Sequence, residues 1–134
     1  MSFQLSVAAR DGELNAIPTA IGASAILEFY SGSAPANCAA GATGTLLASL
    51  SLPSTYFAGA SSGSMALTGT WSGTVGTGGT AGYFRLYDSG PTVCHAQGTV
   101  TLTGGGGDLT LDNNVLGVGQ TITINTFNLT AGNA

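Results

Sequence analysis

The sequence predicts a single all-β domain of about eight short strands, arranged as a β-sandwich, a jelly roll or a small barrel. Hydrophobic residues make up 43% of the 134-residue chain and charged residues only 6%, a balance opposite to that of disordered chains. The 22 glycines, together with many serines and threonines, favour tight turns and short strands. The length fits one domain that covers residues 1–134.

The first elements expected along the chain are a strand and then a short N-terminal helix. Residues 3–7 alternate apolar with polar side chains, as in a strand. Within residues 9–21, Asp11 is suited to cap a short helix. Pro18 would limit or end that helix, because proline lacks a backbone N–H donor.

Two strands are predicted on either side of a loop at residues 32–44. Residues 25–31 alternate between two faces, and residues 46–52 do the same before Pro53 stops the strand. The apolar residues that share one face of the second strand are Leu46, Ala48, Leu50 and Leu52.

The clearest strand of the second half covers residues 83–88, and a return strand is predicted at 93–102. Arg85 lies between two tyrosines on one face of the first of these strands. Because opposite charges pair across neighbouring strands, we expect Arg85 to pair with Glu28 or Asp88.

The last predicted strand, residues 118–129, has a break in its alternation. Two isoleucines occupy one face, whereas Phe127 and Leu129 occupy the other. A bulge near Asn125 or Thr126 would bring all four side chains into one core.

The scarcity of basic residues restricts the partners of this chain. Arg10 and Arg85 are the only cations besides His95, and the net charge is −4. Nucleic-acid binding requires several cations to displace counterions from phosphates, so nucleic acid and anionic membranes are excluded as partners. No apolar run is long enough to span a membrane, and no signal-peptide pattern is present, so we expect synthesis in the cytoplasm.

The same scarcity of charge predicts assembly. Free soluble proteins carry charge on roughly a quarter to a third of their surface, which this chain cannot do. Its surface must consist mainly of small and neutral polar residues, whose desolvation costs little free energy. We expect this surface to be covered by other protein subunits, in preference to the alternative of a neutral but freely soluble surface.

Two loose catalytic patterns occur without the structural context that they require. Residues 59–63 match G-x-S-x-G, and Asp88 and His95 follow in the order of an α/β-hydrolase, but no helix is predicted after Ser61. Residues 76–81 match a loose dinucleotide pattern but lead into a strand instead of a helix. We expect no enzyme and no cofactor, with a hydrolase that uses Ser61 and His95 as a weak alternative.

Few side chains are suited to metal binding or to a disulfide. Asp108 and Asp112 share one face of a strand, where solvated carboxylates are favoured over a hard-cation site. His95 lacks a second histidine or a close cysteine pair, so we expect a structural imidazole and no metal site. Cys38 and Cys94 are the only cysteines, and they form either a disulfide or two free thiols.

Several phrases of the sequence resemble small virion proteins of tailed bacteriophages. They are LEFYSG at 27–32, APA at 34–36, ATGTLLA at 42–48, GYFRLYDSG at 82–90, DLTLD at 108–112 and GQTITI at 119–124. The resemblance implies a capsid decoration (cement) protein on the virion surface, with an antiparallel, jelly-roll-like β-sandwich. The implied partners are the major capsid protein and other copies of the chain, in a dimer or trimer. The alternative is a tail- or fibre-associated module that recognises a host receptor or carbohydrate.

A capsid-binding chain of this kind is expected to make its contacts through polar loops and the N-terminal segment. The candidate contact residues are Phe3, Arg10, Asn37, Tyr56 and Phe57. The last two follow a proline and serve either as exposed anchors or as core residues, and the sequence leaves both alternatives open.

Overall fold

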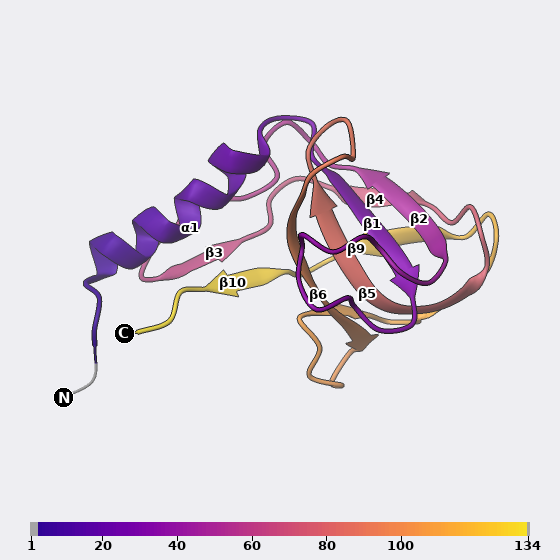
Figure 1. The fold of residues 1–134 in the computed structure, drawn as a ribbon. Coiled ribbons are helices and arrows are strands. Elements are labelled where there is room, and N and C mark those ends of the chain that lie inside the picture. Colours follow the sequence, from indigo (N-terminus) through magenta and orange to yellow (C-terminus); the bar gives the residue numbers. More distant parts are fainter. Residues whose placement is uncertain (1–2, 134) are drawn as a thin grey trace.

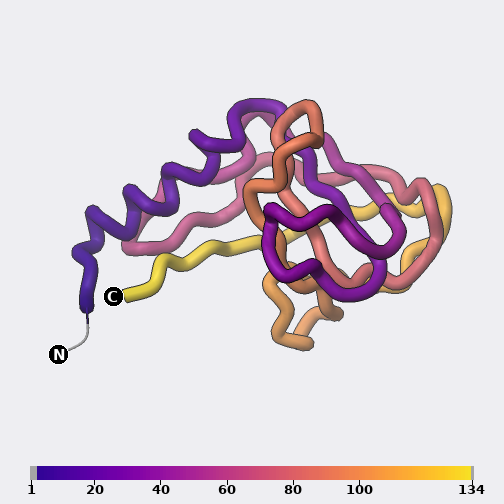
Figure 2. The backbone as a smooth tube through the Cα atoms, in the orientation of Figure 1, coloured from indigo at the N-terminus to yellow at the C-terminus, as the bar shows by residue number. Residues whose placement is uncertain are grey.

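The computed structural model describes residues 3–133 and shows a mostly β chain with one helix (Figure 1). Strands account for 40% of the residues and helix for 11%, which confirms the all-β class. Helix α1 (Val7–Ile21) extends away from most strands and packs on β3 (Ser64–Ala66), which pairs with β10 (Asn128–Thr130). We call these three elements the arm and the remaining strands the β body. The tube in Figure 2 shows that the described residues begin and end at the outer end of the arm.

The β body contains one large sheet and one two-stranded sheet. The large sheet has the order β2-β1-β5-β6-β7, with β8 paired to the start of β5, and β4 pairs separately with β9. Residues 3–133 therefore hold ten strands instead of about eight. The strands of the β body are β1 (Ile26–Ser31), β2 (Leu46–Ser51), β4 (Trp71–Thr74), β5 (Gly79–Tyr87), β6 (Cys94–Leu102), β7 (Leu109–Leu111), β8 (Val115–Leu116) and β9 (Thr121–Ile124).

The two sheets of the β body continue into one another at β2 and β4. An isolated bridge pairs Ala48 with Val75, and the carbonyl of Leu47 accepts from the N–H groups of Gly76 at 2.9 Å and Thr77 at 3.1 Å. The strands therefore follow the order β9-β4-β2-β1-β5-β6-β7 around one core. Strands β7 and β9 are the two ends of this wall, and neither belongs to the other's sheet.

One strand pair departs from the expected antiparallel arrangement, because β7 runs parallel to β6. Parallel neighbours usually need a long crossover connection. Here residues 103–108 fold back on β6, where the hydroxyl of Thr101 accepts from the N–H of Gly107 at 3.0 Å. The carboxylate of Asp108 accepts from the N–H of Thr99 at 3.0 Å, which fixes the start of β7 beside β6.

The predicted N-terminal strand is wrong, since no strand precedes α1 in the described residues. Ser6 caps α1 by accepting from the N–H of Ala9 at 3.1 Å, so the helix begins earlier than expected. Asp11 is therefore not the cap, and its carboxylate instead accepts from the N–H of Gly63 at 2.7 Å. Pro18 lies inside the helix and does not end it.

The alternation predicted for residues 46–52 is interrupted by a bulge. Ala48 pairs with Phe29 while Leu46 pairs with Tyr30, so Leu47 is an extra residue between two pairs. Leu47 is buried as a result, and Leu46, which the alternation places on the apolar face of the strand, is 43% exposed.

The break near the C-terminus separates two strands instead of marking a bulge within one. Strand β9 pairs with β4, whereas β10 pairs with β3 in the arm. Between them, Phe127 is buried against three aromatic rings, with centroid distances of 6.1 Å to Phe57, 5.7 Å to Trp71 and 5.5 Å to Phe84. The change of face in the sequence therefore corresponds to a change of sheet.

Two glycines provide a test of the backbone packing. A Cβ atom on Gly82 would lie against the backbone carbonyl of Gly32, whereas one on Gly12 in α1 would meet nothing within 4 Å. We expect Gly82→Ala to lower the free energy of unfolding by about 2–3 kcal/mol. Gly12→Ala should raise it by about 0.5–1 kcal/mol through helix propensity. Urea denaturation measures both, and equal effects of the two substitutions would contradict this packing.

Candidate functional site

A buried polar cluster lies on the face of β1, β5 and β6 that points away from the main core. The loop of residues 32–44 lies across it (Figure 2). Because β5 is buried on both faces, its alternate side chains enter two environments: Phe84 and Leu86 join the main core, and Tyr83 and Tyr87 join this cluster. The alternation predicted for residues 83–88 is thus confirmed.

Arg85 is the centre of the polar cluster and is only 2% exposed. Its Nη2 donates to the carbonyls of Ala40 at 2.8 Å and Asn37 at 3.3 Å, and its Nε donates to Oε1 of Gln97 at 3.2 Å. The predicted direct pair with Glu28 or Asp88 is therefore replaced by bonds to the covering loop and to Gln97. The reason is that the loop brings carbonyl oxygens onto the same face of the sheet.

Arg85 reaches Glu28 indirectly through two tyrosines. Its Nη1 donates to the hydroxyl of Tyr87 at 3.5 Å, which lies 3.4 Å from the hydroxyl of Tyr30. The hydroxyl of Tyr30 in turn donates to Oε1 of Glu28 at 2.7 Å. Burial raises the pKa of Tyr30, so this hydroxyl keeps its proton and continues to donate.

Further bonds hold the loop on the sheet. The hydroxyl of Tyr83 donates to the carbonyl of Thr43 and accepts from its N–H at 2.9 Å. Gln97 donates to the carbonyl of Pro35 at 2.8 Å. The exposed Asn37 closes a turn in the loop, because its Oδ1 accepts from the N–H of Ala39 at 3.0 Å. The cluster thus uses its polar groups to fasten the loop, which assigns it a structural role.

The cysteines meet at the edge of this cluster. The Sγ atoms of Cys38 in the loop and Cys94 at the start of β6 lie 2.8 Å apart, although the residues are 56 positions apart in sequence. Burial, and then the hydrogen bond with Cys38, raise the pKa of Cys94 to about 12. The folded chain therefore places two thiols in contact, with Cys94 protonated at neutral pH.

The candidate contact residues divide between surface and core. Phe3 is 74% exposed, and Arg10 packs its guanidinium over Gly63 on the arm. Tyr56 is 3% exposed and donates to the carbonyl of Gly22 at 2.8 Å, while Phe57 is 6% exposed within the aromatic core. The interpretation of these two residues as exposed anchors is therefore wrong, because both side chains are buried in the hydrophobic core.

The hydrolase-like residues lie in different settings. Ser61 belongs to a tight turn that is closed by reciprocal backbone bonds with Ser64, at 2.9 and 3.0 Å, and not to a strand–turn–helix elbow. The carboxylate of Asp88 accepts from the N–H of Thr92 at 2.9 Å, which lowers its pKa. The G-x-S-x-G pattern therefore forms a turn that leads into β3.

No group of three or more potential metal ligands is found within residues 3–133. Asp108 is engaged with Thr99, and Asp112 accepts from the hydroxyl of Thr103 at 3.3 Å. Both carboxylates thus hydrogen-bond to residues of or just after β6, and in this way they fix β7 and the turn before it beside β6.

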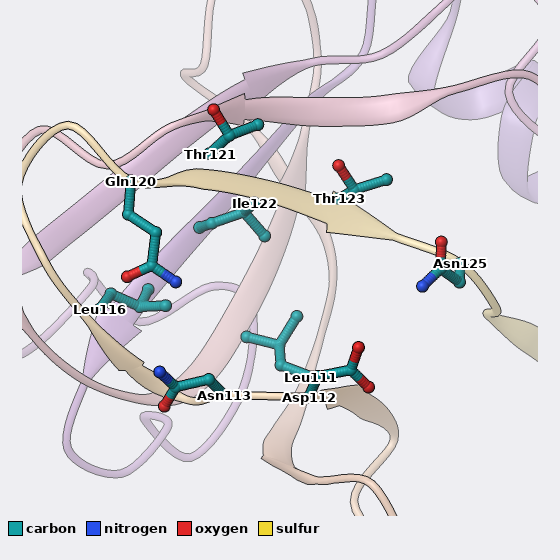
Figure 3. A pocket seen from close by; sticks show the side chains of 9 residues that line it. All are labelled: Leu111, Asp112, Asn113, Leu116, Gln120, Thr121, Ile122, Thr123 and Asn125. Carbon is teal, nitrogen blue, oxygen red and sulfur yellow. The ribbon is translucent and has the colours of Figure 1, made fainter.

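A groove separates the two ends of the strand wall, and Figure 3 shows its interior. It consists of two adjoining cavities of about 250 and 150 Å³, which share residues from both β7 and β9. We call it the β7–β9 groove. Its lining residues are Thr103, Thr110, Leu111, Asp112, Asn113, Leu116, Gln120, Thr121, Ile122, Thr123, Asn125 and Thr126.

The β9 side of the groove offers unpaired backbone groups. The N–H of Val75 donates to the carbonyl of Gln120 at 2.8 Å, which fixes the phase of the antiparallel β4–β9 ladder. In that phase the backbone of Ile122 faces β4, and the backbones of Thr121 and Thr123 face the groove.

The β7 side offers a matching edge. The N–H of Thr103 donates to the carbonyl of Leu111 at 3.0 Å, so the backbone of Leu111 faces β6. The backbone of Thr110, one residue earlier, then faces the groove. In Figure 3 the side chains of Leu111 and Ile122 point toward one another between the two edges. The groove therefore has an apolar floor, a polar rim and hydrogen-bonding backbone on both sides, which suits an extended peptide.

Comparison with known proteins adds no relative, since no protein family, curated protein or solved structure matches this chain. The described residues contain no helix with the length and apolar character needed to cross a membrane.

The role of Arg85 can be tested by Arg85→Met. This change leaves buried loop carbonyls without donors, so we expect the free energy of unfolding to fall by about 2–4 kcal/mol. Arg10→Met is the matched control, because Nε of Arg10 has no hydrogen-bond partner and methionine keeps its packing, and it should cost less than about 1 kcal/mol. Urea denaturation of both variants measures the difference, and a larger effect at Arg10 would refute the role of Arg85.

The cysteine contact predicts an intramolecular disulfide when the purified chain is treated with oxidised glutathione. The two thiols lose two protons and two electrons to the glutathione disulfide, which is released as two reduced glutathione molecules. The bridge should raise the free energy of unfolding by about 4 kcal/mol in the chain-entropy model. Intact mass spectrometry follows the loss of two hydrogens, with Cys94→Ser as the control. Two stable glutathione adducts on each chain would contradict the prediction.

Proposed function

We propose that this chain is a bacteriophage structural protein, a head decoration (cement) protein that binds the outer capsid surface and bridges major capsid subunits. The observation that carries the proposal is the nearly uncharged surface. Only 6% of the residues are charged, and two of these, Glu28 and Arg85, are buried. A surface of this kind loses little when a neighbouring subunit covers it. The proposal includes no catalytic activity.

Exposed apolar side chains and free strand edges add support. Phe3, Val115 and Val118 are each more than half exposed, and the edges of β7 and β9 face the groove. Such features allow many weak contacts on a repeating lattice, where copy number compensates for low single-site affinity.

The finer description of the fold belongs to the same proposal. A wall of strands around one core, closed on one side by the β4–β9 pair, supports a sandwich-like arrangement. The jelly-roll strand order stays a prediction, as does the dimer or trimer.

One observation favours the second candidate, a tail- or fibre-associated module that binds a host carbohydrate. The rim of the β7–β9 groove carries hydroxyl, amide and carboxylate groups, which hydrogen-bond well to sugars. The lining of the groove contains no aromatic ring on which a sugar can stack, so we rank this function second.

Copy number separates the two functions. In purified virions of the phage that encodes this chain, a decoration protein should be present at a number comparable to the major capsid protein, whereas a tail module should be present in a few copies. Quantitative mass spectrometry against labelled peptides of both proteins measures the ratio. The chain's absence from the particles would refute both functions.

A further inference from the structure

We infer that the β7–β9 groove binds an extended segment from a second copy of this chain, and that this segment is residues 3–6. The inference concerns self-association of the isolated chain and does not rest on the capsid proposal. It combines two observations: a slot between two free strand edges, and a segment with the pattern of a strand that belongs to no sheet in its own chain.

The groove has the chemistry of a site for an added strand. The backbone of Thr110 faces it from one side, and the backbones of Thr121 and Thr123 face it from the other. A strand inserted between them would bond to both edges and close the wall. Since β7 has three residues and β9 has four, a short segment is sufficient.

Residues 3–6 have the complementary pattern. In an extended conformation Phe3 and Leu5 lie on one face, and Gln4 and Ser6 lie on the other. In the isolated chain Phe3 is 74% exposed, and the N–H of Leu5 donates to the carbonyl of Asn133 at 2.7 Å. Residues 3–6 belong to no strand of their own copy, and their exchange would replace the bond between Leu5 and Asn133.

The side chains of the groove and the segment also match. Insertion would place Phe3 and Leu5 over the apolar floor at Leu111 and Ile122, and would place the polar pair along the rim. The only charge on the rim is Asp112, and residues 3–6 carry none, so no like charges approach each other.

The geometry requires a second copy as the donor. The 15 residues of α1 separate the segment from the β body by about 22 Å at 1.5 Å per residue. The hydrogen bond between Asp11 and Gly63 holds α1 against the turn before β3, so residues 3–6 stay at the outer end of the arm (Figure 1). Exchange between copies gives a closed dimer or a small ring.

Sedimentation equilibrium of the purified chain tests the inference. Phe3→Asp should weaken self-association by about tenfold or more, through loss of apolar burial and repulsion from Asp112. Thr123→Pro should weaken it similarly, because it removes an N–H that faces the groove and leaves the β4–β9 ladder intact. Val93→Asp, at another exposed apolar residue, is the matched control and should leave the dissociation constant within about twofold.

Mixing the two variants provides the decisive measurement. The Thr123→Pro chain still donates residues 3–6, and the Phe3→Asp chain still offers an intact groove, so the mixture should recover association that neither variant shows alone. If circular dichroism shows that Thr123→Pro does not fold, a peptide of residues 3–7 replaces it as a competitor. A peptide with Gln4 and Leu5 exchanged should then fail to compete. A monomeric parent chain, unaffected association in Phe3→Asp, or absence of recovery and of competition overturns the inference.

Discussion

The arm and the β body are held together by one cluster of buried aromatic rings, formed by Phe57, Trp71, Phe84 and Phe127. Each ring comes from a different part of the chain, and the Nε1 of Trp71 also donates to the carbonyl of Tyr56 at 3.2 Å. Burial of Phe127 requires the chain to leave β9 after four residues and to cross into the arm. The short free edge of β9, and with it the groove, follows from this departure.

The polar cluster shows how a chain with few charges buries a guanidinium. An isolated buried cation is costly, and a buried ion pair with poor geometry can cost more than it contributes. Arg85 avoids both situations, because neutral oxygens of the loop and of Gln97 accept hydrogen bonds from its guanidinium. Glu28 is connected to Arg85 through the hydroxyl groups of two tyrosines. This arrangement makes the loop at 32–44 part of the sheet's outer layer. It also brings Cys38 onto Cys94.

Local alternation predicted the strands at residues 25–31 and 83–88 well, although the pairing of each strand contains register shifts. The burial of Leu47 was not predictable, because the bulge depends on the register with β1. The helix was expected, but its cap is Ser6 and not Asp11. Both residue types can cap a helix, and the role of Asp11 is set instead by its tertiary contact with Gly63. The groove has no sequence signal at all, because it arises from which two strand edges meet at the end of the wall.

Free strand edges usually expose a protein to uncontrolled aggregation, and charged side chains are a common protection against it. This chain has few charged side chains, so its protection against edge-to-edge aggregation must come from the length and position of its edge strands. The edges of β7 and β9 are short, and both border the β7–β9 groove. In the exchange that we infer, a partner strand needs the right length and the right alternation to enter. Under the proposal that this low-charge chain is a subunit of an assembly, such an edge turns a general hazard into a selective contact.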